Sequence, residues 1–356
     1  MSNKKIAILF LSFIFLTSFL THCTGQKETE NKKKEPYDWH FDTSILRNSA
    51  LTKQNLMQAR PDGDGFQEVT FENEDRARLT GLLLERENAR ATIIFSHGFC
   101  PGGKEIFAPF VKIAPQDCNL LFVDQKGYGQ SPGPGVLSRM KQYGRDNYKD
   151  ITGAIDFMKN RNNLPNIVFG WCSGAFNATT AVLKSQEEKK INERNIKGLI
   201  FDSGFSSILD VADIPMNHIK KNYVPSFFTK FYSGTKKEKF RKARRSYICK
   251  FATLIATSFL RVLELFIRPP VVRRNPQTIL TDKVRSLRTP VLVIHSEDDK
   301  LSRWENVRSM VDNIPNKKRW IIEQGRSSHA NHHLKLKEEY KTEMRNWIGD
   351  VLRENT

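Results

Sequence analysis

Cysteine, glycine and proline are all sparse in this chain of 356 residues. The five Cys are scattered, which excludes a disulfide-dense scaffold, and 20 Gly with 15 Pro exclude a collagen-like chain. Acidic residues are also few, because 39 Asp and Glu stand against 57 Lys and Arg and leave a net charge of +18. Such a surface should attract the phosphates of nucleic acid or lipid head groups, or acidic substrates. Large apolar side chains are plentiful, with 24 Phe and five Trp, so a chain disordered throughout is excluded as well.

The N-terminus has the pattern of an export signal. Lys4 and Lys5 precede an uncharged apolar run over residues 6–20, which is shorter than the roughly 20 residues of a helical membrane span. The following Cys23 ends a segment, LTHC, that resembles a bacterial lipobox, in which the cysteine becomes the lipidated first residue of the mature protein. His22 replaces the small residue usual before that cysteine, so an uncleaved signal anchor stays an alternative. Export argues against nucleic acid as a partner.

From about residue 62 onward, short apolar runs alternate with segments of helical periodicity. Strands are expected at 91–96, 119–124, 166–169, 198–201, 290–295 and 320–323, and helices at 143–160 and 175–183. Short apolar strands separated by helices predict a mostly parallel central sheet with helices on both faces, an α/β fold. No phosphate-binding loop and no zinc-site spacing is found, so no cofactor and no metal is expected.

One segment, 206–288, departs from this alternation. It holds 18 Lys and Arg against five Asp and Glu, which is +13 of the net charge. Its nearly apolar stretch at 247–267 contains Lys250, Arg261 and Glu264, and three charges make a membrane span costly. The segment predicts a basic helical cap that covers an apolar cleft or lies on an anionic membrane surface. A packed helical insertion with a solvated basic face is the alternative.

Residues with catalytic potential follow the predicted strands. The segment GWCSG at 170–174 lies between a strand and a helix and fits the pattern G-x-nucleophile-x-G, with Cys172 at its centre. Small outer residues let the backbones approach closely in so sharp a turn. Asp298 and Asp299 follow the strand at 290–295, and His329 lies near the C-terminus. Nucleophile, acid and histidine in this order are typical of α/β-hydrolase triads.

These motifs resemble the α/β-hydrolase superfamily, close to its branch of serine aminopeptidases, lipases and esterases. The resemblance covers roughly 66–352 and rests on HGF (97–99), VDQKGYGQSPG (123–133), GWCSG (170–174), FDSGFSS (201–207), HSEDD (295–299) and SSHAN (327–331). It implies an α/β-hydrolase core at 62–205 and 289–356, interrupted by the cap insertion at 206–288. Residues 1–22 are the expected signal peptide, and 23–61 the lipobox cysteine and a polar tether.

The resemblance implies a triad of Cys172, His329 and Asp299, with Asp298 as the second choice for the acid. The nearest branch has serine at the position of Cys172. Dienelactone hydrolases have cysteine there, within the same G-x-C-x-G pattern, so a cysteine nucleophile is compatible with catalysis. A thiolate would suit activated esters, lactones or thioesters better than amides.

The resemblance also implies an oxyanion hole made by the backbone N–H groups of Phe99 and Ser173. His332 and His333 are expected to face solvent on a helix. Cys100 directly follows Phe99, and the sequence is compatible either with a disulfide to Cys172 or, more simply, with packing of Cys100 in its loop.

The sequence therefore predicts an exported, membrane-tethered hydrolase of ester, thioester or lipid-like acyl substrates. Its expected partners are a small acyl or lipid-like substrate and an anionic membrane surface of the cell envelope. The alternative is a non-catalytic lipoprotein that binds an anionic surface or ligand, since cysteine is often only a small buried apolar residue.

Overall fold

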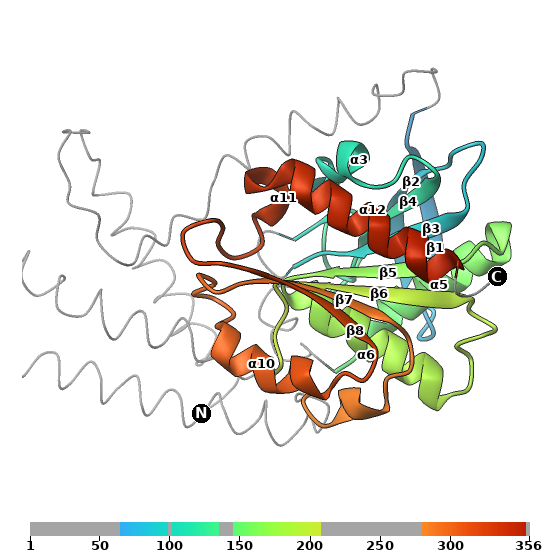
Figure 1. Ribbon diagram of the computed structural model, residues 1–356. Helices are drawn as coiled ribbons and strands as arrows, with labels where there is room; N and C mark the ends of the chain where they lie inside the picture. Colours follow the sequence, from blue (N-terminus) through green and yellow to red (C-terminus); the bar gives the residue numbers. More distant parts are fainter. Residues whose placement is uncertain (1–64, 99–101, 135–144, 208–279, 354–356) are drawn as a thin grey trace, which may run out of the picture. The chain divides into compact units, whose positions relative to one another are not determined.

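The computed structural model describes residues 65–98, 102–134, 145–207 and 280–353, all within one compact unit of the chain. Their central feature is an eight-stranded sheet with the order β1-β2-β4-β3-β5-β6-β7-β8 (Figure 1). The strands are β1 (Gln67–Glu72), β2 (Arg78–Leu84), β3 (Ala91–Ser96), β4 (Cys118–Asp124), β5 (Asn166–Trp171), β6 (Ile196–Asp202), β7 (Val291–Ser296) and β8 (Lys317–Ile322). The pairs β1/β2 and β2/β4 are antiparallel, and every other pair is parallel.

The middle strands are buried on both faces. Every residue of β3, β4, β5 and β7 is buried. Alternate residues of one strand enter opposite cores, as in β3, where Ile94 packs on one side of the sheet and Ile93 and Phe95 on the other. Continuous apolar runs are what a sheet with two covered faces requires.

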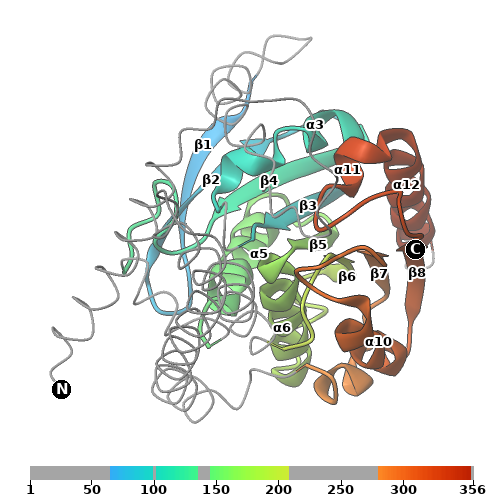
Figure 2. The same ribbon diagram turned by 90° about the vertical axis from the view of Figure 1, so that its left-hand side faces the viewer.

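Helices cover the sheet on both sides (Figure 2). Residues of α5 (Tyr148–Asn162), α6 (Ser173–Glu187) and α10 (Trp304–Asn313) share one core with the sheet. Residues of α3 (Phe110–Ile113) and α12 (Lys337–Arg353) share the other. Short helical turns lie at η1 (Lys104–Phe107), η3 (Lys283–Ser286) and α11 (His332–Lys335).

The predicted fold class is confirmed, and all six expected strands are present within two or three residues of their expected ends. The hairpin of β1 and β2 was not predicted. β1 is an edge strand in which only Val69 and Phe71 are buried, so its apolar signal is too sparse to stand out in the sequence. The helices α10 and α12 were also missed, because charged residues interrupt their apolar positions.

Several predictions concern residues outside the described part. These are the signal at 1–22, the tether at 23–61 with Cys23, and most of the cap, 208–279. Among the described helices, none combines the length and the apolar character needed to span a membrane.

Candidate active site

The turn after β5 holds Cys172 in a strained conformation. β5 ends at Trp171 and α6 begins at Ser173, so Cys172 alone connects strand and helix with φ 57° and ψ −124°. The flanking glycines are required sterically. A Cβ on Gly170 would lie 2.3 Å from the Cα of Ala175, and one on Gly174 would lie 2.0 Å from the carbonyl oxygen of Ser96. The chain can therefore turn here only because both outer residues lack a side chain.

The structure brings together the three side chains predicted to form a triad. His329 Nε2 lies 3.0 Å from Cys172 Sγ, and His329 Nδ1 lies 2.7 Å from Asp299 Oδ2. Cys172 directly follows β5, while Asp299 and His329 lie in the loops after β7 and β8. The carboxyl ends of these parallel strands meet at one edge of the sheet. A nucleophile, a base and an orienting carboxylate are thus in hydrogen-bonding sequence.

Asp299, rather than Asp298, faces the histidine. Asp299 Oδ1 accepts hydrogen bonds from the backbone N–H groups of Leu301 at 3.0 Å and Ser302 at 2.7 Å, which leaves Oδ2 directed at His329. The Asp298 carboxylate instead accepts a hydrogen bond from the N–H of Gly325. The geometry therefore favours the first of the two predicted acids.

Burial and charge act in opposite directions on the pKa values of Asp299 and His329. Burial by itself would raise the pKa of Asp299, but the positive charge and hydrogen bond of His329 outweigh it and lower that pKa below its ordinary value. Burial would likewise lower the pKa of His329. The negative charges of Asp299 and Cys172 prevail and raise it well above 6.5. An ionised Asp299 is thus matched to an imidazole that readily holds a second proton.

The surroundings of the predicted oxyanion hole are only partly described. Ser173 is buried at the start of α6, where the helix N-terminus favours negative charge. Gly98 packs on the nucleophile, since a Cβ there would lie 3.1 Å from Cys172 Cβ and 3.4 Å from Sγ. Phe99 and Cys100 lie outside the described residues, so the oxyanion role of Phe99 and a Cys100–Cys172 disulfide stay predictions.

Hydrogen bonds among buried polar side chains hold the backbone at His97 and Gly98. His97 Nε2 accepts a hydrogen bond from the Gln125 backbone N–H at 3.2 Å, so the ring proton sits on Nδ1, which donates to the Gly98 carbonyl at 2.7 Å. The Gln125 amide donates to the His97 carbonyl at 2.9 Å and accepts from Asn177 at 2.9 Å. Sequence reasoning missed Gln125 and Asn177, because only their contacts across the fold distinguish them from surface amides.

A buried ion pair joins Lys104 and Asp124. Lys104 Nζ lies 2.7 Å from Asp124 Oδ2, and both side chains are fully buried. The backbone N–H of Lys104 donates to Asp124 Oδ1 at 2.7 Å, and Nζ also donates to Gln130 at 2.9 Å. The chain at Lys104 is thereby held at the carboxyl end of β4.

The expected exposure of His332 and His333 is wrong, because both are buried, at 0% and 3% exposure. The short helix α11 turns inward against the aromatic core, where the His333 ring stacks on Phe110 with centroids 4.9 Å apart. Burial without a charged partner lowers the pKa of His333 to about 4. The sequence around His332 and His333 has no apolar periodicity that would predict their burial.

Two further features bear on ligand binding. In the part of the chain that the structure describes, no group of three or more His, Cys, Asp or Glu is arranged to hold a metal ion.

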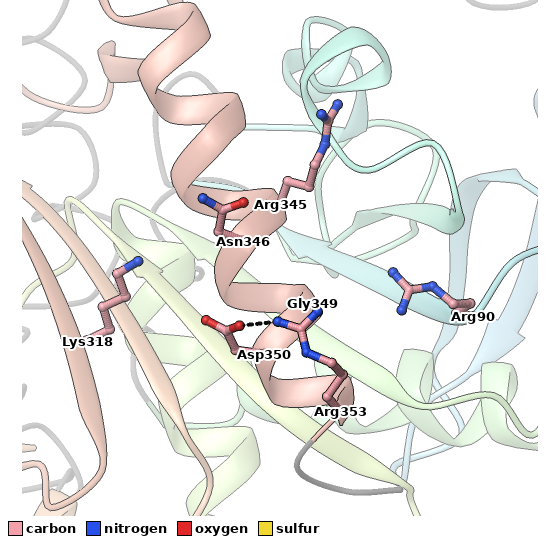
Figure 3. A pocket seen from close by; sticks show the side chains of 7 residues that line it. All are labelled: Arg90, Lys318, Arg345, Asn346, Gly349, Asp350 and Arg353. Atoms are coloured by element: carbon pink, nitrogen blue, oxygen red, sulfur yellow. Dashed lines mark hydrogen bonds and ion pairs between the residues drawn. The ribbon is translucent and has the colours of Figure 1, made fainter.

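A hollow of about 490 Å³ is lined by residues near the start of β3, the start of β8 and the end of α12 (Figure 3). Its cations are largely paired, as in Arg353–Asp350 at 2.6 Å and Lys318–Glu343 at 2.8 Å, so it offers little free charge to a ligand.

Comparison with known proteins agrees with this architecture. Residues 87–240 match a family model described as serine aminopeptidase, S33. An uncharacterized protein of Salmonella typhi, YfhR, is 28% identical over 161 residues, which is 41% of this chain and 51% of that protein. The chain thus spans about half the length of the curated relatives it matches. The family match includes Cys172 but ends before Asp299 and His329, so these two positions rest on the geometry above.

Solved structures share the fold at low sequence identity. An esterase from Pyrococcus furiosus has a TM-score of 0.57 and 16% identity, covering 92% of this chain and 99% of its own. A bacterial membrane phospholipase A has a TM-score of 0.53 and 12% identity, covering 97% and 99%. The sheet and these similarities confirm the predicted resemblance to the α/β-hydrolase superfamily.

Proposed function

We propose that this α/β-hydrolase superfamily member hydrolyses carboxylic esters or thioesters of acyl or lipid-like substrates, with Cys172 as nucleophile. The observation that carries the proposal is the continuous chain Cys172 Sγ, His329, Asp299, with contacts of 3.0 and 2.7 Å. A fully buried carboxylate that orients the base and a nucleophile on a strained turn are the parts that acyl transfer needs.

In the acylation step, His329 Nε2 takes the proton of Cys172 and the thiolate attacks the substrate carbonyl carbon. The resulting oxyanion is stabilised by the N–H groups of Ser173 and Phe99, each worth about 3–4 kcal/mol in such sites. When the carbonyl re-forms, the bond to the leaving oxygen or sulfur breaks and His329 passes its proton to the departing alcohol or thiol. Asp299 holds the imidazole in one tautomer throughout.

In the deacylation step, His329 removes a proton from water, and the hydroxide attacks the acyl–sulfur carbon. The carbon–sulfur bond breaks, the acid is released, and Cys172 recovers its proton from His329. Because the second half uses the same base and the same oxyanion donors, a single geometry serves both steps.

The substrate class is proposed from the chemistry of a thiolate and from the structural neighbours. A thiolate favours good leaving groups, so activated esters and thioesters come before amides. The neighbours named above are an esterase and a membrane phospholipase A, which is consistent with acyl or lipid-like substrates. The basic segment at 206–288, with its net charge of +13, would hold the protein against anionic lipid near such substrates.

Rapid alkylation of Cys172 tests the activated nucleophile. We expect iodoacetamide at pH 7 to label Cys172 at least about 100-fold faster than Cys118, because Cys172 lies beside an imidazole and Cys118 lies near a carboxylate instead. Cys118 is a natural internal control, since burial raises its pKa to about 12. Peptide mapping over time gives both rates, and His329→Ala should slow the labelling of Cys172 alone. Equal slow labelling of the two thiols would favour the non-catalytic lipoprotein.

Attachment to the cell envelope is proposed from the N-terminus. Lys4, Lys5, the apolar run at 6–20 and Cys23 support export followed by acylation of Cys23. Acyl chains and a basic cap together provide the two signals that stable anchoring requires. We expect Cys23→Ser to move the protein from the membrane fraction to the soluble fraction, or to leave an unprocessed precursor. An intact mass showing an unmodified mature N-terminus elsewhere would contradict lipidation.

A further inference from the structure

A second group of buried polar side chains lies behind the candidate triad and has no part in the mechanism above. Asp202 is the last residue of β6 and Ser203 follows it, His332 belongs to α11, and Tyr340 belongs to α12. All four are completely buried. The backbone carbonyl of Asp202 also accepts the N–H of Cys172 at 2.9 Å, so this group contacts the nucleophile turn directly.

Four short contacts run through the group in a line. Ser203 Oγ lies 2.7 Å from Asp202 Oδ1 and 2.8 Å from His332 Nε2. His332 Nδ1 lies 2.7 Å from Ser327 Oγ, which lies 2.7 Å from Asn331 Oδ1. Distances this short are hydrogen bonds, so each contact needs one hydrogen.

The group has one hydrogen fewer than its four contacts require. The hydroxyls of Ser203 and Ser327 and a neutral His332 ring supply one each, which makes three for four contacts. Asn331 Oδ1 supplies none, since it accepts the N–H of Ser328 at 3.0 Å while the Asn331 amide donates to Ser328 Oγ at 2.8 Å. An ionised Asp202 supplies none either.

We propose that the Asp202–Ser203–His332 group holds one additional proton and thereby fixes the loop that carries His329 in its working position. This inference rests on the proposed function, because the working position is that of the catalytic base. Asp202, Ser203 and His332 are positioning residues, since none of them touches the reacting atoms.

The proton resides on the carboxyl of Asp202. Complete burial raises the pKa of Asp202 to about 7, and burial lowers the pKa of His332 to about 3. The protonated carboxyl then donates to Ser203, Ser203 donates to His332 Nε2, and His332 Nδ1–H donates to Ser327. Asp202 Oδ2 accepts the hydroxyl hydrogen of Tyr340 at 2.6 Å. Every contact in the line now has one hydrogen, and no charge is buried.

The loop is tied to this group next to the catalytic histidine. The backbone N–H of Ala330 donates to Ser203 Oγ at 3.0 Å, and Ser203 also receives the Asp202 proton, so both of its lone pairs are used. Loss of the proton leaves one contact without a hydrogen and an uncompensated carboxylate in the core. The hydrogen bond between Ala330 and Ser203, one residue from His329, is then weakened.

A dependence on pH follows from the groups around Asp202. Tyr340 of α12, His332 of α11 and Ser203 face its carboxyl, and across the site the charge of His329 lowers its pKa while that of Asp299 raises it. The anchored state is present while Asp202 is protonated and is lost as the pH rises through about 7. Since the proton is shared within the group, the observed midpoint belongs to the whole network.

The asparagine replacement separates this role from a merely structural one. In Asp202→Asn, the amide nitrogen would donate to Ser203 and the amide oxygen would accept from Tyr340, which copies the protonated acid at every pH. At pH 6 we expect kcat on a chromogenic ester to stay within about threefold of wild type, whereas Asp202→Ala should lower it at least about tenfold. The fall of wild-type kcat near pH 7 should be absent in Asp202→Asn. An unchanged fall in that variant would overturn the proposal.

A spectroscopic measurement separates this proposal from the hydrolase itself. In ¹⁵N spectra of the full chain labelled at histidine, with His332→Gln as the assignment control, we expect His332 at pH 6 to carry its proton on Nδ1 and none on Nε2. A proton on Nε2 would overturn the proposal whatever the activity. If His332 carries its proton on Nδ1 but the protein has no hydrolase activity, the proposed function is contradicted and the additional proton on the Asp202–Ser203–His332 group is still supported. The His329 signals should move in Asp202→Ala if the loop is anchored as described.

Discussion

Replacing Cys172 or His329 with alanine is expected to lower the turnover of a chromogenic ester or thioester by at least about 10³-fold, with Cys172→Ala/His329→Ala little worse than either single variant. The two side chains share one proton at a contact of 3.0 Å, so neither works without the other. Multiplicative effects would instead mean that they act independently. The measurement is kcat/KM for each single variant and for the double variant, with folding checked by circular dichroism.

Cys118→Ala is the matched control for this experiment. Cys118 is also a buried cysteine on the central sheet, but its Sγ lies near Asp117 at 3.9 Å rather than near an imidazole. Its replacement should leave kcat/KM within a few-fold of wild type. Turnover that survives in Cys172→Ala would contradict the role of the thiol as nucleophile.

Asp299→Asn is expected to lower kcat by about 10⁴-fold, while Asp298→Asn changes it by less than a few-fold. Asp299 Oδ1 accepts two backbone N–H groups, so the asparagine oxygen would take that place and the amide nitrogen would face His329 Nδ1. A donor there forces the ring proton onto Nε2, which can then no longer accept the proton of Cys172. The neighbouring Asp298 carboxylate only accepts the N–H of Gly325.

The pH profile gives a second test of the same acid. The negative charges of Asp299 and Cys172 raise the pKa of His329 well above 6.5, and removal of the Asp299 charge should lower it again. Histidine titration followed by NMR in Asp299→Asn should therefore show a lower His329 pKa than in wild type. An equal loss of activity in Asp298→Asn would mean that the carboxylates exchange roles in solution.

The buried parts of the fold could be predicted from local sequence because their environment is uniform. Runs such as ATIIFS at 91–96 place apolar residues on both faces of the strand, as a strand covered on both faces requires. The turn GWCSG could be predicted because its glycines have a local steric cause, the contacts that a Cβ would make with Ala175 and Ser96. The hairpin of β1 and β2 could not, since an edge strand with two buried residues carries little signal.

Sequence alone determined the order of Cys172, the acidic pair and His329, and that each follows a strand. Only the tertiary structure decided that Asp299 faces His329 and that Cys172 meets a residue 157 positions away. Only the tertiary structure placed His332 in the core beside Asp202. The physical reason is that a strand or a glycine turn follows from neighbouring residues, whereas the direction of a side chain in a loop depends on backbone contacts made by distant segments. Asp299 is aimed by the N–H groups of Leu301 and Ser302, and the loop carrying His329 is held by Ser203.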